Sequence, residues 1–467
     1  MKACCFQFNS VAKFAPASLS TVCNRAGTRA GIKVCHKVSK LLGFGMKHLP
    51  CFLSQRHVRL LNAHHQDARA LKKDTLISPT HVMATMGSTF GGADTDTDQQ
   101  AVALFRQLVP TLGGNYKGAH GKVAIVGGCL EFTGAPFFAA MSALRVGADM
   151  AYVICTPSAA TAIKSYSPEL MVLPYLPEQP LGSGVDPSMV SSADEATVSG
   201  AVARILSWTS RASAVVVGPG LGSNPGVVAT VTVLMRETRK KMQPLVVDGS
   251  ALTHIVAKDP ETVQGYRLCI LTPNVAELGR IGEAVGVQLP GKMSDAWLQF
   301  APQVARAFHG PVVLAKGEVD LLCGPGGADE GGPGELQPLM RCTDPGSPRR
   351  CGGQGDVLAG TAATFLGWAF KHQQLHAQNL AAAEAAAPPP NASPAQPPQP
   401  TQSPEGITRA PGSNGLDEAT VALCGFMACK VMRGAARQTF LIGERSMVAG
   451  DIIPLLYPTF KKVVGCL

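Results

Sequence analysis

The segment "GKVAIVGGCLEFTGAPFFAAMSALRVGADM" (121–150) combines a short apolar run, a turn with paired glycines and a stretch of helical spacing. The run "VAIVGG" (123–128) is β-branched and has no polar position, as expected for a strand buried on both faces. A helix that ends near Gly147 follows it. Because strand, turn and helix form the repeating unit of α/β proteins, we predict one such unit here.

Similar apolar runs recur along the chain, each followed by loop residues and a helical period. They are "AVVVG" (214–218), "LVVD" (245–248), "CILT" (269–272) and "PVVLAKG" (311–317). Strands that alternate with helices are joined by right-handed crossovers and form a layered structure. The sequence therefore predicts a three-layer α/β/α sandwich with a mostly parallel central sheet. Ligands bind at the carboxyl ends of such strands, where the Gly-rich segments of this chain also fall.

The amino-terminal region has an unusual charge pattern. Its first 66 residues contain ten Lys or Arg and no Asp or Glu, with Ser and Ala interspersed, which is typical of a mitochondrial or chloroplast transit peptide. A basic tail without targeting function is the alternative, and the cytoplasm remains a further location to consider. Removing these ten from 41 Lys and Arg leaves 31 against 32 Asp and Glu, so the rest is near neutral. The lack of excess positive charge on this part of the chain argues against nucleic-acid binding.

These patterns predict residues 1–95 as transit peptide and disordered segment, and residues 96–460 as one folded domain. Two inserts interrupt that domain: an enlarged hairpin loop at 323–340 and an Ala/Pro/Gln-rich disordered insert at 376–416. An amphipathic helix is expected over 416–440. No run of 18 apolar residues lacks charged, Pro or Gly interruptions, so we expect no membrane span.

The 14 cysteines do not form a metal-binding pattern. Five lie in the presumed transit segment, and no C-x-x-C pair occurs anywhere in the chain. The usual spacing of zinc ligands is therefore missing, and we interpret the remaining cysteines as reduced core or loop thiols.

The segment "GSPRRCGGQGDVLAG" (346–360) is the strongest candidate for chemistry. A Gly-rich loop that leads into a helix presents unpaired N–H groups and the positive end of the helix dipole, so it can bind an anion. A carboxylate beside such a loop is what phosphoryl transfer to an alcohol needs, because a base must take the hydroxyl proton. We expect the positive environment to keep Asp356 ionised. Helix capping by Asp356, a surface turn, and a metal or redox site at Cys351 are the alternatives.

Three other Gly-rich segments are weaker candidates on their own. The segment 121–150 contains neither G-x-G-x-x-G nor a Walker motif, and "GPGLG" (218–222) is compatible with a simple turn. In "LTPNVAELGRI" (271–281), Asn274 and Glu277 have the spacing of a capping box. Their side chains at a strand exit could also hold polar groups of a substrate.

Together these residues resemble a known family. In order, "KGAHGKVAIVGGCLEFTGAPFFAAMSALRVGADM", "IKSYSPELMV", "VVVGPGLG", "LTPNVAEL", "AKGEVDLL" and "SPRRCGGQGDVLAG" are similar to the ATP-dependent (S)-NAD(P)H-hydrate dehydratases of the ribokinase-like superfamily. The resemblance runs from about residue 115 to 445. It implies repair of the hydrated nucleotides NADHX and NADPHX: ATP phosphorylates the C6 hydroxyl, and loss of phosphate restores NADH or NADPH. Hydroxide is a poor leaving group and phosphate a good one.

The resemblance also implies roles for individual residues. Asp356 is the expected base, and Mg²⁺ is expected to be held through the ATP phosphates, with no protein ligand assigned. The residues expected to contact the hydrate are Gly147, Gly220, Asn274, Val275, Ala276, Glu277, Leu278, Gly279, Arg280 and Asp356. Those expected to bind ATP are Lys316, Gly317, Glu318, Val319, Asp320, Gly346, Ser347, Pro348, Arg349, Arg350, Cys351, Gly352, Gly353, Gln354 and Gly355.

The chain departs from some relatives, in which an epimerase domain precedes the dehydratase. We therefore expect the epimerase of the same pathway to be a separate polypeptide. The preferred hydrate and the formation of a homo-oligomer are left open. Two other functions remain as alternatives: a ribokinase-like kinase acting on a sugar, hydroxymethylpyrimidine or thiazole alcohol, and a non-catalytic nucleotide-binding protein.

Overall fold

The computed structural model describes residues 95–113, 116–178, 193–290, 296–326, 336–386 and 416–465. All of them belong to one compact unit, Ser78–Leu467. The transit peptide expected in 1–95 lies outside the described residues except for its last residue.

The centre of the fold is a nine-stranded sheet in the order β3-β2-β1-β4-β5-β6-β7-β8-β9. Strands β3 to β7 in this order run parallel, β8 is antiparallel to β7, and β9 is antiparallel to β8. The five predicted strands are confirmed as β1 (Lys122–Val126), β4 (Ala214–Val217), β5 (Leu245–Val247), β6 (Cys269–Leu271) and β7 (Val312–Ala315). The sequence did not indicate β2 (Met150–Ile154) or β3 (Met171–Leu173), whereas β8 (Asp320–Cys323) and β9 (Met340–Cys342) flank the predicted hairpin loop.

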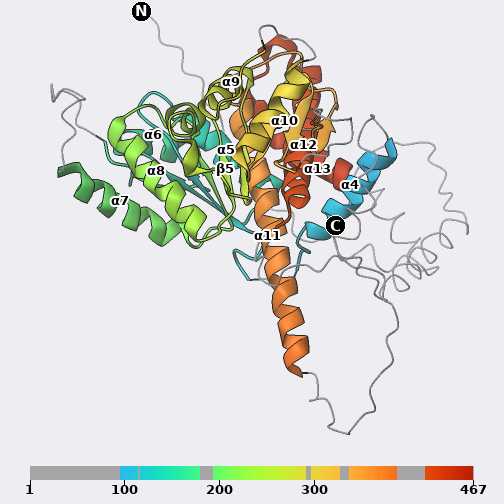
Figure 1. The fold of residues 1–467 in the computed structure, drawn as a ribbon, viewed down its shortest axis with the longest axis horizontal. Helices are drawn as coiled ribbons and strands as arrows, with labels where there is room; N and C mark the ends of the chain where they lie inside the picture. Colours follow the sequence, from blue (N-terminus) through green and yellow to red (C-terminus); the bar gives the residue numbers. More distant parts are fainter. Residues whose placement is uncertain are drawn as a thin grey trace, which may run out of the picture. The chain divides into compact units, whose positions relative to one another are not determined.

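Helices cover both faces of this sheet, as expected for a three-layer α/β/α sandwich (Figure 1). One layer contains α5 (Gly134–Val146), α6 (Pro157–Tyr166), α11 (Gln354–Ala386), α12 (Glu418–Gly443) and α13 (Ala449–Val464). The other contains α7 (Ala193–Thr209), α8 (Pro225–Lys240), the π-helix η3 (Leu252–Val256), the 3₁₀ turn η4 (Pro260–Thr262), α9 (Val275–Ala284) and α10 (Ala296–Phe308). Helix α4 (Thr95–Leu108) packs on α12 and α13, which the short turn η5 (Glu444–Ser446) connects.

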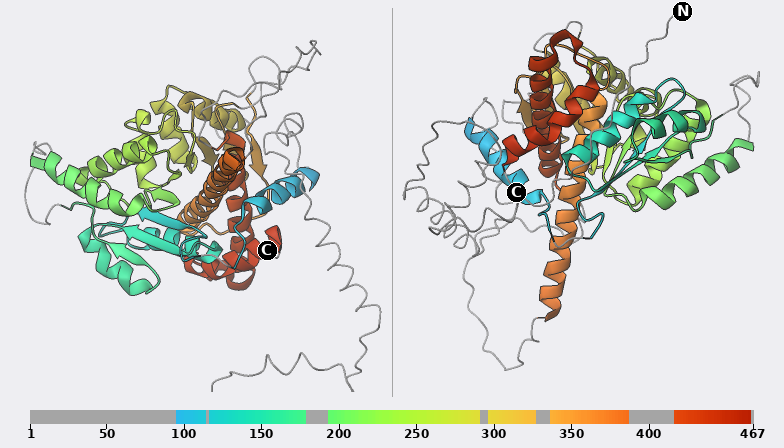
Figure 2. Two further views of the ribbon diagram at one scale, coloured as in Figure 1. Left: turned by 90° about the horizontal axis from the view of Figure 1, so that it is seen from below. Right: turned by 180° about the vertical axis from the view of Figure 1, so that it is seen from behind.

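Helix α11 crosses the whole molecule. It begins at the carboxyl edge of the sheet, passes under β1, β4 and β5, and continues beyond the opposite edge (Figure 2). The structure corrects one predicted boundary, because residues 376–386 belong to this helix rather than to a disordered insert. Their composition explains the difference, since "HAQNLAAAEAA" is rich in the best helix-forming residue. Residues 387–415 of the predicted insert lie outside the described residues.

The loop insert predicted at 323–340 joins the antiparallel strands β8 and β9, so its hairpin location is confirmed. Residues 323 and 340 themselves belong to these strands, and 327–335 lie outside the described part. Strand β8 runs antiparallel to β7 and starts beside its carboxyl end, so β8 ends at the amino edge of the parallel strands. Strand β9 pairs antiparallel with β8 and therefore starts at the same edge. The insert therefore leaves the sheet on the side opposite to the start of α11.

Within the described residues, one helical stretch, Glu418–Ser446, is long and apolar enough to cross a membrane by length and composition. Two thirds of its most apolar window, 67%, is buried inside the protein. Helix α12, which forms most of this stretch, packs against α11, α13 and strands β6 to β9. Its apolar composition is thus explained by its position in the core.

Candidate active site

Three strands and one helix bring polar side chains together at the carboxyl edge. Asp248 follows β5, Thr272 follows β6 and Lys316 follows β7. The Lys316 amine and the Thr272 hydroxyl both donate hydrogen bonds to Oδ1 of Asp248, at 2.8 Å and 2.7 Å. Asp248 is only 3% exposed, so this is a buried ion pair with a second donor. Such a pair holds Lys316 in one place.

The first turn of α11 lies directly on this pair. A Cβ atom at Gly355 would be 3.2 Å from Nζ of Lys316 and 3.6 Å from Oδ2 of Asp248. At Gly353 the backbone has a φ of 96°, and a Cβ would lie 2.7 Å from both Phe138 and Ala449. Side chains at either position would keep the loop away from its neighbours. The glycines thus let the backbone approach the charged groups closely, which supports the predicted anion-binding loop.

The environment of Asp356 is less positive than the sequence indicated. Burial is the main cause that raises the pKa of Asp356 from its ordinary value of 3.8 to about 7, and the nearby carboxylate of Asp248 raises it further. Lys316 and the backbone at the helix start oppose these effects only in part. The expectation that Asp356 stays ionised took account only of nearby positive charge, whereas burial and then Asp248 shift its pKa in the opposite direction.

Lys316 keeps its charge in this cluster. Burial by itself would lower the pKa of the Lys316 amine, but Asp248, Glu277 and Asp356 together raise it above its ordinary value. Burial also raises the pKa of Glu277, and Lys316 partly offsets this. One cation is thus shared among three carboxyl groups from three different elements. The arrangement can exchange a proton at Asp356 while Lys316 supplies a fixed positive charge.

The segment Asn274–Arg280 forms the start of α9. Asn274 accepts a hydrogen bond from the backbone N–H of Glu277 at 3.0 Å, and the Glu277 carboxylate accepts one from the N–H of Asn274 at 2.8 Å. The predicted capping box is confirmed. Leu278 and Gly279 are buried beneath the helix, whereas Arg280 is exposed. Only the polar first turn of this segment is therefore available to a ligand at the carboxyl edge.

The two segments predicted to bind ATP are joined by Arg433 of α12, which sequence reasoning had missed. Its guanidinium pairs with the buried Asp320 at 3.0 Å and donates to the backbone oxygens of Glu318 and Asp344. The other Asp320 oxygen accepts from the N–H of Gly317. Asp320 is thus used to shape the turn 316–320. Arg433 holds this turn beside the chain that enters the loop 346–355.

The loop 346–355 is fixed by its own side chains. Ser347 accepts from the N–H of Arg349, and the Arg349 guanidinium donates to the backbone oxygen of Met447 at 2.9 Å. Arg350 is exposed, whereas Arg349 is half-buried, so Arg350 is the arginine that extends toward solvent. Gln354 donates to the sulfur of Cys351 at 3.3 Å. The described cysteines, Cys351 among them, are free thiols.

Aromatic side chains lie near Gly220. With a φ of 59°, Gly220 sits so close to the β1–α5 loop that a Cβ would be 2.4 Å from the Phe132 oxygen. Phe132 is 55% exposed and Tyr166 is 45% exposed, which is unusual for large aromatic side chains. The Tyr166 hydroxyl is hydrogen bonded to Thr133, and its ring contacts Phe137 at 5.3 Å between centroids. These rings form an exposed apolar surface next to the Gly353 loop.

Gly147 does not join the other predicted site residues. It ends α5 and precedes β2, so it lies at the amino edge of the sheet. With a φ of 123°, a Cβ there would be 3.2 Å from the ring of Trp368, which lies twelve positions after Asp356 along α11. The structure therefore separates Gly147 from Gly220, Asn274, Lys316 and Asp356.

The main residue that sequence reasoning missed at this site is Asp248. Its signal was present, because "LVVD" ends a buried strand with a carboxylate at the carboxyl edge. Thr272 ends "CILT" in the same way. Among the described residues, no group of three or more His, Cys, Asp or Glu side chains could hold a metal ion.

Comparisons with known proteins show which family the sequence resembles. A family model described as NAD(P)H-hydrate dehydratase matches residues 123–399. An ATP-dependent (S)-NAD(P)H-hydrate dehydratase from Physcomitrium patens is 39% identical over 302 residues, covering 60% of this chain and 80% of that relative. One from Danio rerio is 32% identical over 397 residues, covering 84% of this chain and 98% of that relative.

Among solved structures, the ADP/ATP-dependent NAD(P)H-hydrate dehydratase from Bacillus subtilis, co-crystallised with ATP and Mg²⁺, is 14% identical with a TM-score of 0.47. It is matched over 78% of this chain and 97% of that chain. The family model spans more than half of the present chain, and the two sequence relatives are matched over most of their length. The chain therefore belongs to the family of ATP-dependent (S)-NAD(P)H-hydrate dehydratases.

Proposed function

We propose that this chain dehydrates the S forms of NADHX and NADPHX with ATP at the carboxyl edge of the sheet. The observation that carries this proposal is the placement of Asp356 at the start of α11, beside an anion-binding loop and above the pair formed by Lys316 and Asp248. The family's reaction needs a base for a hydroxyl proton and a cradle for a transferring phosphoryl group. Both are present within one small region.

In the proposed first step, the C6 hydroxyl oxygen of the hydrate attacks the γ-phosphorus of ATP, and Asp356 takes the hydroxyl proton. ADP leaves. In the second step, the bond from C6 to the phosphorylated oxygen breaks, and loss of the proton on C5 restores the ring double bond. A base whose pKa lies near the working pH is the most efficient for such a transfer. The pKa of about 7 at Asp356 fits this requirement.

ATP is proposed to bind between the turn 316–320 and the loop 346–355. The N–H groups at the start of α11 would face the transferring phosphoryl group, and Lys316 would supply positive charge to the developing anion. When bound, Mg²⁺ would neutralise charge on the phosphate oxygens, which would hold it. Asp320 would contribute by shaping the turn, since Arg433 and Gly317 occupy its carboxylate oxygens.

The hydrated nicotinamide ring is proposed to lie against the exposed aromatic surface of Phe132 and Tyr166. This surface adjoins Gly220, and Phe138 of the same region contacts the Gly353 loop. The saturated carbons of the hydrated ring gain apolar burial against such neighbours. The polar first turn of α9, with Asn274 and Glu277, would then face the carboxamide or ribose. Gly147 is left outside this proposed site.

The experiment that tests the proposal uses Asp356→Asn. The variant should retain ATP binding, measured by equilibrium dialysis, and should lose the ATP-dependent recovery of NADH from NADHX. A control variant is Lys461→Gln in the exposed last turn of α13, which should leave turnover nearly unchanged because Lys461 lies outside the proposed site. Full activity of Asp356→Asn would remove Asp356 from the role of base. A small-molecule kinase would instead release a stable phosphate ester, so an accumulating ester would favour that alternative.

We further propose that the chain is imported into a mitochondrion or chloroplast, on the basis of the acid-free residues 1–66. The R and S hydrates would then need an epimerase in the same compartment as a separate polypeptide. A fluorescent fusion of residues 1–95 tests the location. Uniform cytoplasmic fluorescence would contradict the import proposal without affecting the assigned reaction.

A further inference from the structure

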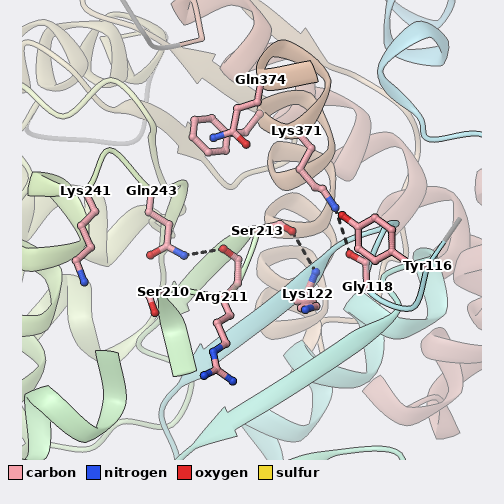
Figure 3. A pocket seen from close by; sticks show the side chains of 12 residues that line it. Tyr116, Gly118, Lys122, Ser210, Arg211, Ser213, Lys241, Gln243, Lys371 and Gln374 are labelled. Atoms are coloured by element: carbon pink, nitrogen blue, oxygen red, sulfur yellow. Dashed lines mark hydrogen bonds between the residues drawn. The ribbon is translucent and has the colours of Figure 1, made fainter. Parts of the chain in front are cut away.

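A polar cavity lies at the amino edge of the sheet, opposite the proposed active site. It has a volume of about 350 Å³ and is bordered by four cationic side chains: Lys122, Arg211, Lys241 and Lys371. Figure 3 shows Lys241 and Arg211 on one side and Lys122 and Lys371 on the other. No carboxylate occurs among the described side chains that line the cavity.

These cations come from four separate segments of the fold. Lys122 starts β1, Arg211 follows α7, Lys241 ends α8 and Lys371 lies on α11. The negative ends of the helix dipoles explain a cation after α7 and one after α8. They do not explain Lys122, which begins a strand, or Lys371, which lies in the interior of a helix. The helix dipoles therefore account for only two of the four cations that border the cavity.

The side-chain amines of Lys371 and Lys122 both lie beside Gly118. The Lys371 amine donates to the backbone oxygens of Gly118 and Ala119, at 3.1 Å and 2.6 Å, and a Cβ at Gly118 would lie 3.1 Å from Nζ of Lys122. Burial lowers the pKa of Lys371, and the charge of Lys122 lowers it further, although Asp149 opposes both. Among the described residues, neither lysine forms an ion pair with a carboxylate. A bound anion would relieve this repulsion.

The walls of the cavity are held in place by hydrogen bonds. Gln243 donates to the backbone oxygens of Thr209 and Ala212, at 2.6 Å and 2.7 Å, which ties the loop after α8 to the loop after α7. Two residues after Gly118, the His120 backbone oxygen accepts a hydrogen bond from the indole of Trp368 at 2.6 Å. The cations therefore converge on a surface whose backbone is already ordered. Such preorganisation lowers the cost of binding a ligand.

Aromatic side chains are the second feature of this cavity. Tyr116 is 75% exposed at its rim, and Phe370 of α11 also lines it. An exposed ring beside several cations matches a ligand that has both a flat base and phosphates. We propose that this cavity is a second nucleotide site, which binds a nucleoside diphosphate or triphosphate through its phosphates. It is distinct from the ATP site at Asp356 and does not depend on the activity assigned there.

The test compares charge reversal at the cavity with a matched reversal elsewhere. The full chain, Arg211→Glu/Lys241→Glu and Lys461→Glu/Lys462→Glu are titrated with labelled ADP in equilibrium dialysis. The control pair lies in the exposed last turn of α13 and changes the net charge equally. We expect two equivalents of ADP per chain in the wild type and in the control, and one in the cavity variant. We also expect affinity for pyrophosphate at the second site to fall about tenfold or more in that variant.

A single equivalent of ADP in the wild type would overturn the proposal, and so would two unchanged equivalents in the cavity variant. A second measurement avoids substitutions altogether. Lysine acylation of the wild type is followed by mass spectrometry with and without ADP. Protection of Lys122 and Lys241, with Lys461 equally labelled in both samples, supports the site. Equal labelling of all three lysines contradicts it.

Discussion

Replacing Asp356 by Asn should stabilise the folded chain at alkaline pH while it removes activity. The folded state holds the pKa of Asp356 at about 7, above the ordinary 3.8, so it binds the proton more tightly than the unfolded chain does. The free energy of unfolding therefore falls as the pH rises from the lower value to the upper one, and remains low above it. The difference between these two values corresponds to about 4 kcal/mol. Asn resembles the neutral acid in shape and carries no charge.

The assay is urea unfolding of the wild type and Asp356→Asn across this pH range. The other titrating groups are common to both proteins, so the difference between their free energies of unfolding isolates Asp356. We expect this difference to be close to zero near about pH 4 and to approach about 4 kcal/mol in favour of the variant near about pH 8. A difference that does not change with pH would refute the reasoning. A variant less stable than the wild type at alkaline pH would refute it as well.

Three further predictions follow from the same cluster and its neighbours. Asp248→Asn should lower the pKa of Asp356, because a repelling charge is removed and Lys316 no longer pairs with it. The part of the pH profile in which kcat/KM rises with pH should therefore move to lower pH by about one unit. An unmoved profile would argue against the role of Asp248. Phe132→Ala should raise the KM for the hydrate about tenfold and leave the KM for ATP unchanged, as steady-state kinetics can measure, whereas Phe132→Tyr should restore binding. Arg433→Met should lower the free energy of unfolding by about 3 kcal/mol and raise the KM for ATP, since Asp320 then loses its partner. Unaltered ATP kinetics in a folded Arg433→Met protein would show that the turn 316–320 does not bind ATP.

The sheet was predictable where strands are buried on both faces, because β1, β4, β5, β6 and β7 have uninterrupted apolar runs. Strand β3 has only three residues, and β8 begins with the charged Asp320, whose ion pair to Arg433 is a long-range contact. Such a contact has no local signal in the chain. The end of the predicted insert at 376 was misplaced for a different reason, since low complexity and helix propensity coincide in the Ala-rich residues.

At the site, local rules were sufficient for the capping box and the Gly-rich loop. The pKa of Asp356 was not predictable in the same way, because it depends first on burial and then on Asp248, a carboxylate 108 positions earlier in the chain that the fold brings close. Gly147 lies apart from the cluster for a reason that is also non-local. It belongs to a segment that contributes to the site through its first turn, yet the helix α5 carries its last residue to the other edge of the sheet.

ATP-dependent dehydration is tested by following the dihydronicotinamide absorbance of NADHX incubated with the purified chain, ATP and Mg²⁺. We expect the absorbance to return, one ADP and one phosphate to form for each NADH recovered, and Asp356→Asn to show no return. ATP consumption with a stable phosphorylated product and no recovered NADH would contradict it.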